Sequence, residues 1–266
     1  MERRAVVAGA FYPAAADKLA DMLDGMIDKS SPGEQCIAVV APHAGYVYSG
    51  RVAGATYSKV VIPGRVLILA PNHTGAGRAV SLYPGEAWQT PLGRIQTDRE
   101  LNRLLEESGS VEPDERAHAR EHSAEVHLPF LQHLRPDVKI SVAAIATHDY
   151  DVLRSLGLAA AAAIRMLAGG TLIVASSDMT HFEHQRVANA QDRLAIARIE
   201  ALDPGGLLET VASRGISMCG AGPVAAALFA ALDLGAREAR LVAYETSGDV
   251  TGETDSVVGY AGLVIK

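Results

Sequence analysis

Residues 36–43 read CIAVVAPH, a short apolar run that is rich in valine and ends in a histidine. Residues 66–73 (VLILAPNH) repeat the pattern, and residues 171–181 (TLIVASSDMTH) give a third apolar run with a histidine beyond its end. Such continuous runs are typical of parallel strands that helices cover on both faces. Ligands of an open α/β sheet bind beyond the carboxyl ends of these strands. The sequence therefore predicts an α/β fold that brings three histidines to one cleft.

Helical patterns separate these strands along the chain. Apolar residues at helical spacing predict helices over residues 16–27, 97–107, 122–134, 152–167, 182–202, 207–213 and 223–232. Further strands are predicted over residues 138–146, 239–244 and 256–265. Neither a linker nor a repeat interrupts this order. The prediction is one domain over residues 1–266, with a mostly parallel central sheet flanked by helices.

Composition and charge narrow the possible classes of function. The net charge is −7 and no basic stripe is visible, which argues against a nucleic-acid partner. Cys36 and Cys219 are the only cysteines, too few for a disulfide framework, so we expect a cytoplasmic protein. No signal-peptide pattern follows Met1. The most apolar stretch contains Arg165 and a Gly-Gly break, which predicts a helix followed by a strand and no membrane partner.

Two of the strand-end histidines and one cysteine predict a metal site. His43 and His73 end their strands, and neutral imidazole is a common ligand of zinc, iron and copper. Cys219 precedes a predicted helix, whose amino terminus is expected to lower the pKa of the thiol and favour the thiolate. Each residue alone is more often a buried core residue. Together they predict His43, His73 and Cys219 as metal ligands.

Other polar residues are candidates for the same cleft. Asp178 and His181 lie three residues apart at a predicted helix start, where the carboxylate can orient the imidazole for acid-base catalysis. The alternative that Asp178 merely caps the helix stays open. The candidate residues that line the cleft are Tyr48, Asn72, His122 and Glu125. His127 and His133 are expected at the surface, and Pro129 is expected to kink its helix.

The ordered set of motifs resembles the Memo family over nearly the whole chain. The matching segments are VAGAFYP (7–13), PHAGYVYSG (42–50), PNHTG (71–75), TPLG (90–93), EHSAEV (121–126), SDMTHF (177–182), MCG (218–220), TSGDV (246–250) and VVGY (257–260). The family is similar to the class III extradiol ring-cleaving dioxygenases, which use non-haem Fe(II) on an α/β fold. The resemblance implies that fold, a metal centre at His43, His73 and Cys219, and Asp178 and His181 in the same cleft.

The resemblance leaves two functions open. The ring-cleaving enzymes have a glutamate as third ligand, and a thiolate in its place favours copper, zinc or redox-active iron. One function is a metal-dependent oxidoreductase that uses Fe(II) or copper, O₂ and a small substrate, with His181 as the base. The other is a binding, adaptor or metal-handling protein that holds a small molecule or peptide in the cleft without turnover. A cysteine nucleophile is a weaker third possibility, because no hydrolase turn surrounds Cys219.

Overall fold

Four parallel strands form the centre of the sheet in this computed structural model, which describes residues 2–30 and 32–266. Their order across the sheet is β8 (Lys139–Ile145), β3 (Arg65–Pro71), β9 (Leu172–Ser176) and β2 (Ala38–Ala41). Each neighbouring pair in this set is parallel. The three apolar runs that lead to histidines in the sequence, which form β2, β3 and β9, are therefore adjacent strands that run in the same direction. The predicted α/β fold class is confirmed.

Further strands extend the sheet on both sides, antiparallel next to β2 and in mixed directions next to β8. Beyond β2 lie β12 (Val257–Ile265), β11 (Ala239–Thr246) and β10 (His181–Glu183), with both β10 and β11 paired to β12. Beyond β8 lie β6 (Gly93–Thr97), β5 (Ala87–Thr90), β1 (Glu2–Arg3), β4 (Val80–Leu82) and β7 (Glu112–Pro113). The sequence did not predict these last five strands, because they are short and lack a continuous apolar run.

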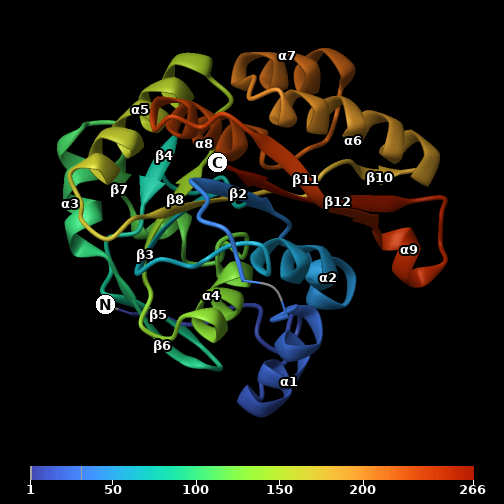
Figure 1. The fold of residues 1–266 in the computed structure, drawn as a ribbon, viewed down its shortest axis with the longest axis horizontal. Helices are drawn as coiled ribbons and strands as arrows, with labels where there is room; N and C mark the ends of the chain where they lie inside the picture. The colour runs from blue at the N-terminus through green and yellow to red at the C-terminus, as the bar shows by residue number, and fades with distance from the viewer. Residues whose placement is uncertain (1, 31) are drawn as a thin grey trace.

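Helices cover both faces of the sheet (Figure 1). One face carries α1 (Ala16–Met26), α2 (Tyr46–Tyr57) and α4 (Leu128–Leu134). The other carries α3 (Arg99–Glu107), α5 (Tyr150–Arg165), α6 (Gln185–Glu200), α7 (Pro204–Arg214) and α8 (Ala221–Asp233), while the short α9 (Ser247–Thr251) packs on β12. None of the helices in the described parts of the chain is long and apolar enough to cross a membrane.

Burial on two faces explains the continuous apolar runs. Along β3, Val66 and Ile68 pack in the core beneath α1, α2 and α4, whereas Leu67 and Leu69 pack in the core beneath α5 and α8. Because successive side chains of a strand point to opposite faces, a strand between two helical layers needs apolar residues at every position. This requirement is why β3 shows no alternation of polar and apolar residues.

Two predicted helices begin at least three residues later than the sequence indicated. Residues 122–134 form a 3₁₀ turn at Glu125–His127 followed by α4, and Pro129 lies in the first turn of α4. The expected kink is wrong, because a missing N–H at that position breaks no helical bond. The predicted helix over 182–202 begins at Gln185, since His181–Glu183 instead pairs with β12.

Candidate metal centre

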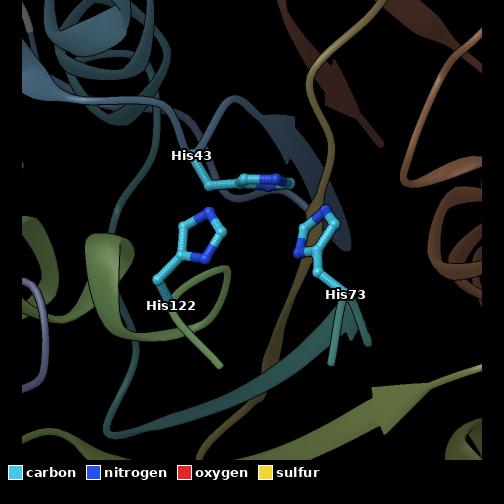
Figure 2. A group of neighbouring side chains, drawn as sticks. All are labelled: His43, His73 and His122. Atoms are coloured by element: carbon cyan, nitrogen blue, oxygen red, sulfur yellow. The ribbon is translucent and has the colours of Figure 1, made fainter. Parts of the chain in front are cut away.

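Three histidine rings face one another beyond the carboxyl ends of the central strands (Figure 2). His43 follows β2 and His73 follows β3, whereas His122 comes from the segment between β7 and α4. Ring centroids are 5.3 Å apart for His43 and His73, 5.6 Å for His43 and His122, and 5.0 Å for His73 and His122. One ring nitrogen from each residue lies within 4.8 Å of the other two. Since ligand bonds of about 2.0–2.3 Å place the donors of one ion within roughly 4.6 Å of each other, the rings are close to a metal-binding arrangement.

Glu121 holds the ring of His73. Its carboxylate lies 2.9 Å from His73 Nδ1 and also accepts the backbone N–H groups of His73, His122 and Ser123. Burial opposes the charged forms of both partners, but their mutual hydrogen bond and charge outweigh it. The pKa of Glu121 is therefore lowered to about 2, and the pKa of His73 is raised. A carboxylate on Nδ1 leaves Nε2 of His73 to face the cluster, as in many metal-binding histidines.

His43 is buried and neutral. Its backbone N–H donates to Asp178 Oδ1 at 2.8 Å, and its Nδ1 lies 2.7 Å from Ser176 Oγ. Burial, followed by the charges of His73 and His122, holds the pKa of His43 well below its usual value. Burial likewise lowers the pKa of His122. Neutral rings keep the lone pairs that a metal ion requires.

Cys219 lies against the cluster. Its Sγ is 3.4 Å from His43 Nε2 and accepts the backbone N–H of Asp178 at 3.3 Å. The residue stands just before α8, as predicted, but burial and the Asp178 carboxylate raise the pKa of the thiol. The expectation of a lowered pKa is wrong for the metal-free protein, because loss of water outweighs the helix amino terminus. A coordinated cation reverses this balance and favours the thiolate.

Asp178 and His181 do not form the expected pair. Asp178 turns to His43, whereas Nδ1 of the half-buried His181 lies 2.9 Å from the carbonyl oxygen of Ser217. The backbone N–H of His181 also donates to Ser217 Oγ. Because a carbonyl only accepts, His181 carries its proton on Nδ1, and Nε2 remains as a proton acceptor.

The remaining candidates have different surroundings. Asn72 folds the turn after β3 by accepting from the N–H groups of Thr74 and Gly75. Tyr48 is 42% exposed on the first turn of α2. Glu125 is fully buried, and Arg3 is its partner at 2.6 Å. Glu125 therefore faces the amino-terminal segment of the chain and not the histidine cluster.

His127 is a buried residue, so its expected surface position is wrong. It is fully buried, and its Nε2 lies 2.8 Å from Ser176 Oγ. The apolar residues that follow it, LPFL, belong to a helix packed on the sheet and carry His127 inward. Sequence reasoning also passed over Glu121 and Ser176, although Glu121 directly precedes His122 and Ser176 ends β9.

A largely apolar pocket of about 630 Å³ lies beside the Cys219 loop. α7 and residues 215–219 form most of its wall, and His148 contributes a polar group. Its lining residues are His148, Leu208, Val211, Ala212, Gly215, Ile216, Ser217, Met218, Cys219 and Ala221. This volume and lining are typical of a site for a small molecule.

The model of the Memo-like protein family matches residues 3–264. The chain belongs to the Memo family. A MEMO1 family protein of Methanothermobacter thermautotrophicus is 42% identical over 276 residues, which cover 99% of this chain and all of the relative. A second, of Methanopyrus kandleri, is 41% identical over 281 residues and covers all of this chain and 99% of the relative. The resemblance read from the sequence motifs is thus confirmed.

Among solved structures, the Memo fold resembles an uncharacterized protein of Escherichia coli K12, JW3007. The two superpose with a TM-score of 0.57 at 15% identity, over 86% of this chain and all of that one. At this identity the likeness concerns the fold.

Proposed function

We propose that this Memo family protein binds a transition-metal ion at His43, His73 and His122, with Cys219 as a further donor, and uses it as a non-haem oxidoreductase. The observation that carries the proposal is the approach of three ring nitrogens to within 4.8 Å of one another, on rings held by Glu121 and Ser176. Nitrogen donors beside a thiol suit copper, zinc and iron.

The donor set accommodates such an ion with the loss of protons only. His43 and His122 are held neutral by burial, whereas His73, whose pKa Glu121 raises, loses its Nε2 proton on coordination and keeps the bond from Nδ1 to Glu121. An Fe(II) or copper ion bound here supplies one-electron chemistry and open positions for small ligands. Cys219 is a soft donor at contact distance from His43 Nε2, and its thiol proton leaves on coordination.

The surrounding residues then bind the substrate and move its proton. His181 Nε2 accepts a proton from the substrate, while the bond from Nδ1 to the Ser217 carbonyl fixes the ring. Burial raises the pKa of Asp178, and its carboxylate, when ionised, stabilises the positive charge that His181 acquires with the proton. The pocket beyond Cys219 holds the apolar part of a small molecule.

Oxygen uptake by the Fe(II)-loaded protein tests this function. The metal-free protein is loaded anaerobically with Fe(II) or Cu(I), mixed with a panel of catechols and other small reductants, and followed with an oxygen electrode. We expect one ion per chain and substrate-dependent uptake, both lost in His73→Ala and retained in His133→Ala. His133 is the matched control, because its ring binds Asp24 on the outside of the molecule. Failure of wild-type protein to bind any ion would refute the proposal.

Cys219 favours one second function, that of a metal-handling or adaptor protein without turnover. A thiol beside imidazoles is a soft donor set that retains Cu(I) tightly. Under this function the protein binds one ion, transfers it to a chelator or partner, and takes up no oxygen with any member of the panel. A peptide or small molecule held in the cleft without chemical change belongs to the same class.

A further inference from the structure

Ser176 Oγ is a junction of three buried hydrogen bonds beneath the metal centre. It lies 2.7 Å from His43 Nδ1, 2.8 Å from His127 Nε2 and 2.8 Å from the carbonyl oxygen of Ser123. Ser176, Ser123 and His127 are fully buried, and His43 is almost so. No proton in this group can therefore be supplied or taken up by bulk water without a local opening.

The positions of the protons follow from the chemistry of the three partners. A serine hydroxyl has one proton to donate and two lone pairs to accept with. The Ser123 carbonyl can only accept, so the hydroxyl proton of Ser176 points to it. Both imidazole nitrogens must then donate to Ser176. His43 is consequently protonated on Nδ1, and His127 on Nε2.

The outer nitrogen of His127 completes the chain. Its Nδ1 lies 3.0 Å from the hydroxyl of Tyr57, a residue of α2. His127 is fully buried and contacts no carboxylate among residues 2–30 and 32–266, so its ring is neutral and Nδ1 is an acceptor. Tyr57 therefore donates to His127. Every donor along the chain from Tyr57 through His127 to Ser176 has an acceptor.

We propose that Ser176, backed by His127 and Tyr57, is a positioning residue that locks His43 in the tautomer with its proton on Nδ1. Locked in this way, His43 presents the lone pair of Nε2 to Cys219 and to the metal centre. The role in metal affinity rests on the proposed metal-binding function, whereas the tautomer itself is a property of the metal-free protein. Outer partners of this kind set both the tautomer and the orientation of a ligand ring.

The same hydroxyl also joins the segments that carry the three rings. Ser176 ends β9 and binds His43 beyond β2, while Ser123 and His127 lie on the segment that carries His122. Ser123 Oγ in turn donates to the carbonyl of Pro71, two residues before His73. Removal of the Ser176 hydroxyl is therefore expected to loosen all three rings relative to one another.

Nitrogen-15 spectra of the histidine rings test the tautomer directly in metal-free wild-type protein. At neutral pH, protonated and bare ring nitrogens have well-separated chemical shifts. We expect His43 protonated on Nδ1 alone and His127 on Nε2 alone. If His43 is instead protonated on Nε2, or exchanges between the two forms, the proposal is wrong. This measurement needs neither a metal nor a variant that folds.

Co(II) titration of two serine variants tests the effect on affinity. Ser176→Ala is expected to weaken Co(II) binding by about 10–100-fold, the usual effect of losing an outer partner of a ligand. Ser141→Ala is the matched control, because Ser141 is a fully buried serine of β8, which β3 separates from β9, and its hydroxyl donates to the backbone carbonyl of Asp98. If both variants lose similar thermal stability but only Ser176→Ala binds Co(II) more weakly, the result supports a positioning role for Ser176.

The outcomes separate this inference from the proposed function. Equal Co(II) affinity in Ser176→Ala and wild-type protein would overturn the positioning role while leaving the metal site in place. Absence of Co(II) binding in wild-type protein, with His43 still protonated on Nδ1, would refute the metal-binding function and leave the tautomer assignment standing. Tyr57→Phe, which removes only the outermost donor, is expected to change the affinity less than Ser176→Ala.

Discussion

Replacement of Glu125 by glutamine is expected to cost far more stability than loss of an ordinary ion pair. The carboxylate is fully buried and accepts from Arg3 Nη1 at 2.6 Å, from the Tyr12 hydroxyl at 2.6 Å and from the N–H groups of Val6 and Val7. Arg3 is only 5% exposed and lies 4.1 Å above the Trp88 ring. Glutamine keeps the shape of the side chain but leaves the guanidinium of Arg3 without a counter-charge.

The size of the effect follows from the burial of this pair. Removing one partner of a buried ion pair costs about 3–5 kcal/mol. In a protein of roughly this size each kcal/mol lowers the melting temperature by about 2–4 °C, so Glu125→Gln should melt roughly 6–20 °C below wild type. Thermal melting of the metal-free proteins measures the difference, and unfolding rates replace it if melting is irreversible.

Glu107→Gln provides the control for this measurement. Glu107 pairs with Arg103 at 2.7 Å on the surface of α3, where the two side chains are 58% and 57% exposed. An exposed pair of this kind contributes about 0.3–0.5 kcal/mol. If Glu125→Gln melts as close to wild type as Glu107→Gln does, the buried pair contributes little. Arg3 would then be stabilised by its backbone partners and Trp88 alone.

Three further predictions concern the metal centre and its surroundings. Cys219→Ser should keep the metal-free fold but lose most of its affinity for Cu(I), because a serine hydroxyl stays protonated. The Co(II)-loaded variant should also lack the thiolate-to-metal absorption band. Unchanged metal binding with lowered thermal stability would show that Cys219 is a packing residue. If the protein turns over a substrate, His181→Ala should lower the rate by about 10²–10⁴-fold with wild-type metal content, and a metal-free variant would show that His181 is a ligand. The third prediction concerns pH and the metal-free protein. Because the pKa of Glu121 is lowered on folding, its contribution to stability is complete above pH 4.5 and decreases as the pH falls towards 2. Because the pKa of His73 is raised on folding, its contribution is complete below pH 6.5 and decreases as the pH rises through the raised pKa. The free energies of unfolding of wild type and Glu121→Gln, measured by denaturation at a series of pH values, should therefore differ most between pH 4.5 and 6.5. A difference that does not change with pH would contradict the pairing of Glu121 with His73.

The sequence alone determined the central strands of the sheet and the edge at which two of its histidines lie. β2, β3 and β9 were predicted because burial on two faces requires an unbroken apolar run, and this requirement is visible within a few residues. The ends of β2 and β3 placed His43 and His73 at the same edge, since parallel strands end together. The Memo family motifs were equally local. The short strands β1, β4, β5, β6 and β7 escaped prediction because pairing with a neighbour, and not their own composition, holds them in the sheet.

Only the tertiary structure decided which residues complete the site. His122 joins His43 and His73, whereas His181 lies apart on the Ser217 carbonyl, because the packing of the segment from 118 to 127 against three strand ends sets these distances. A short segment of sequence does not indicate which distant residues of the chain it contacts in the fold. The raised pKa of Cys219 and the burial of His127 also depend on the tertiary structure, because the residues packed around a side chain set its ionisation and its exposure.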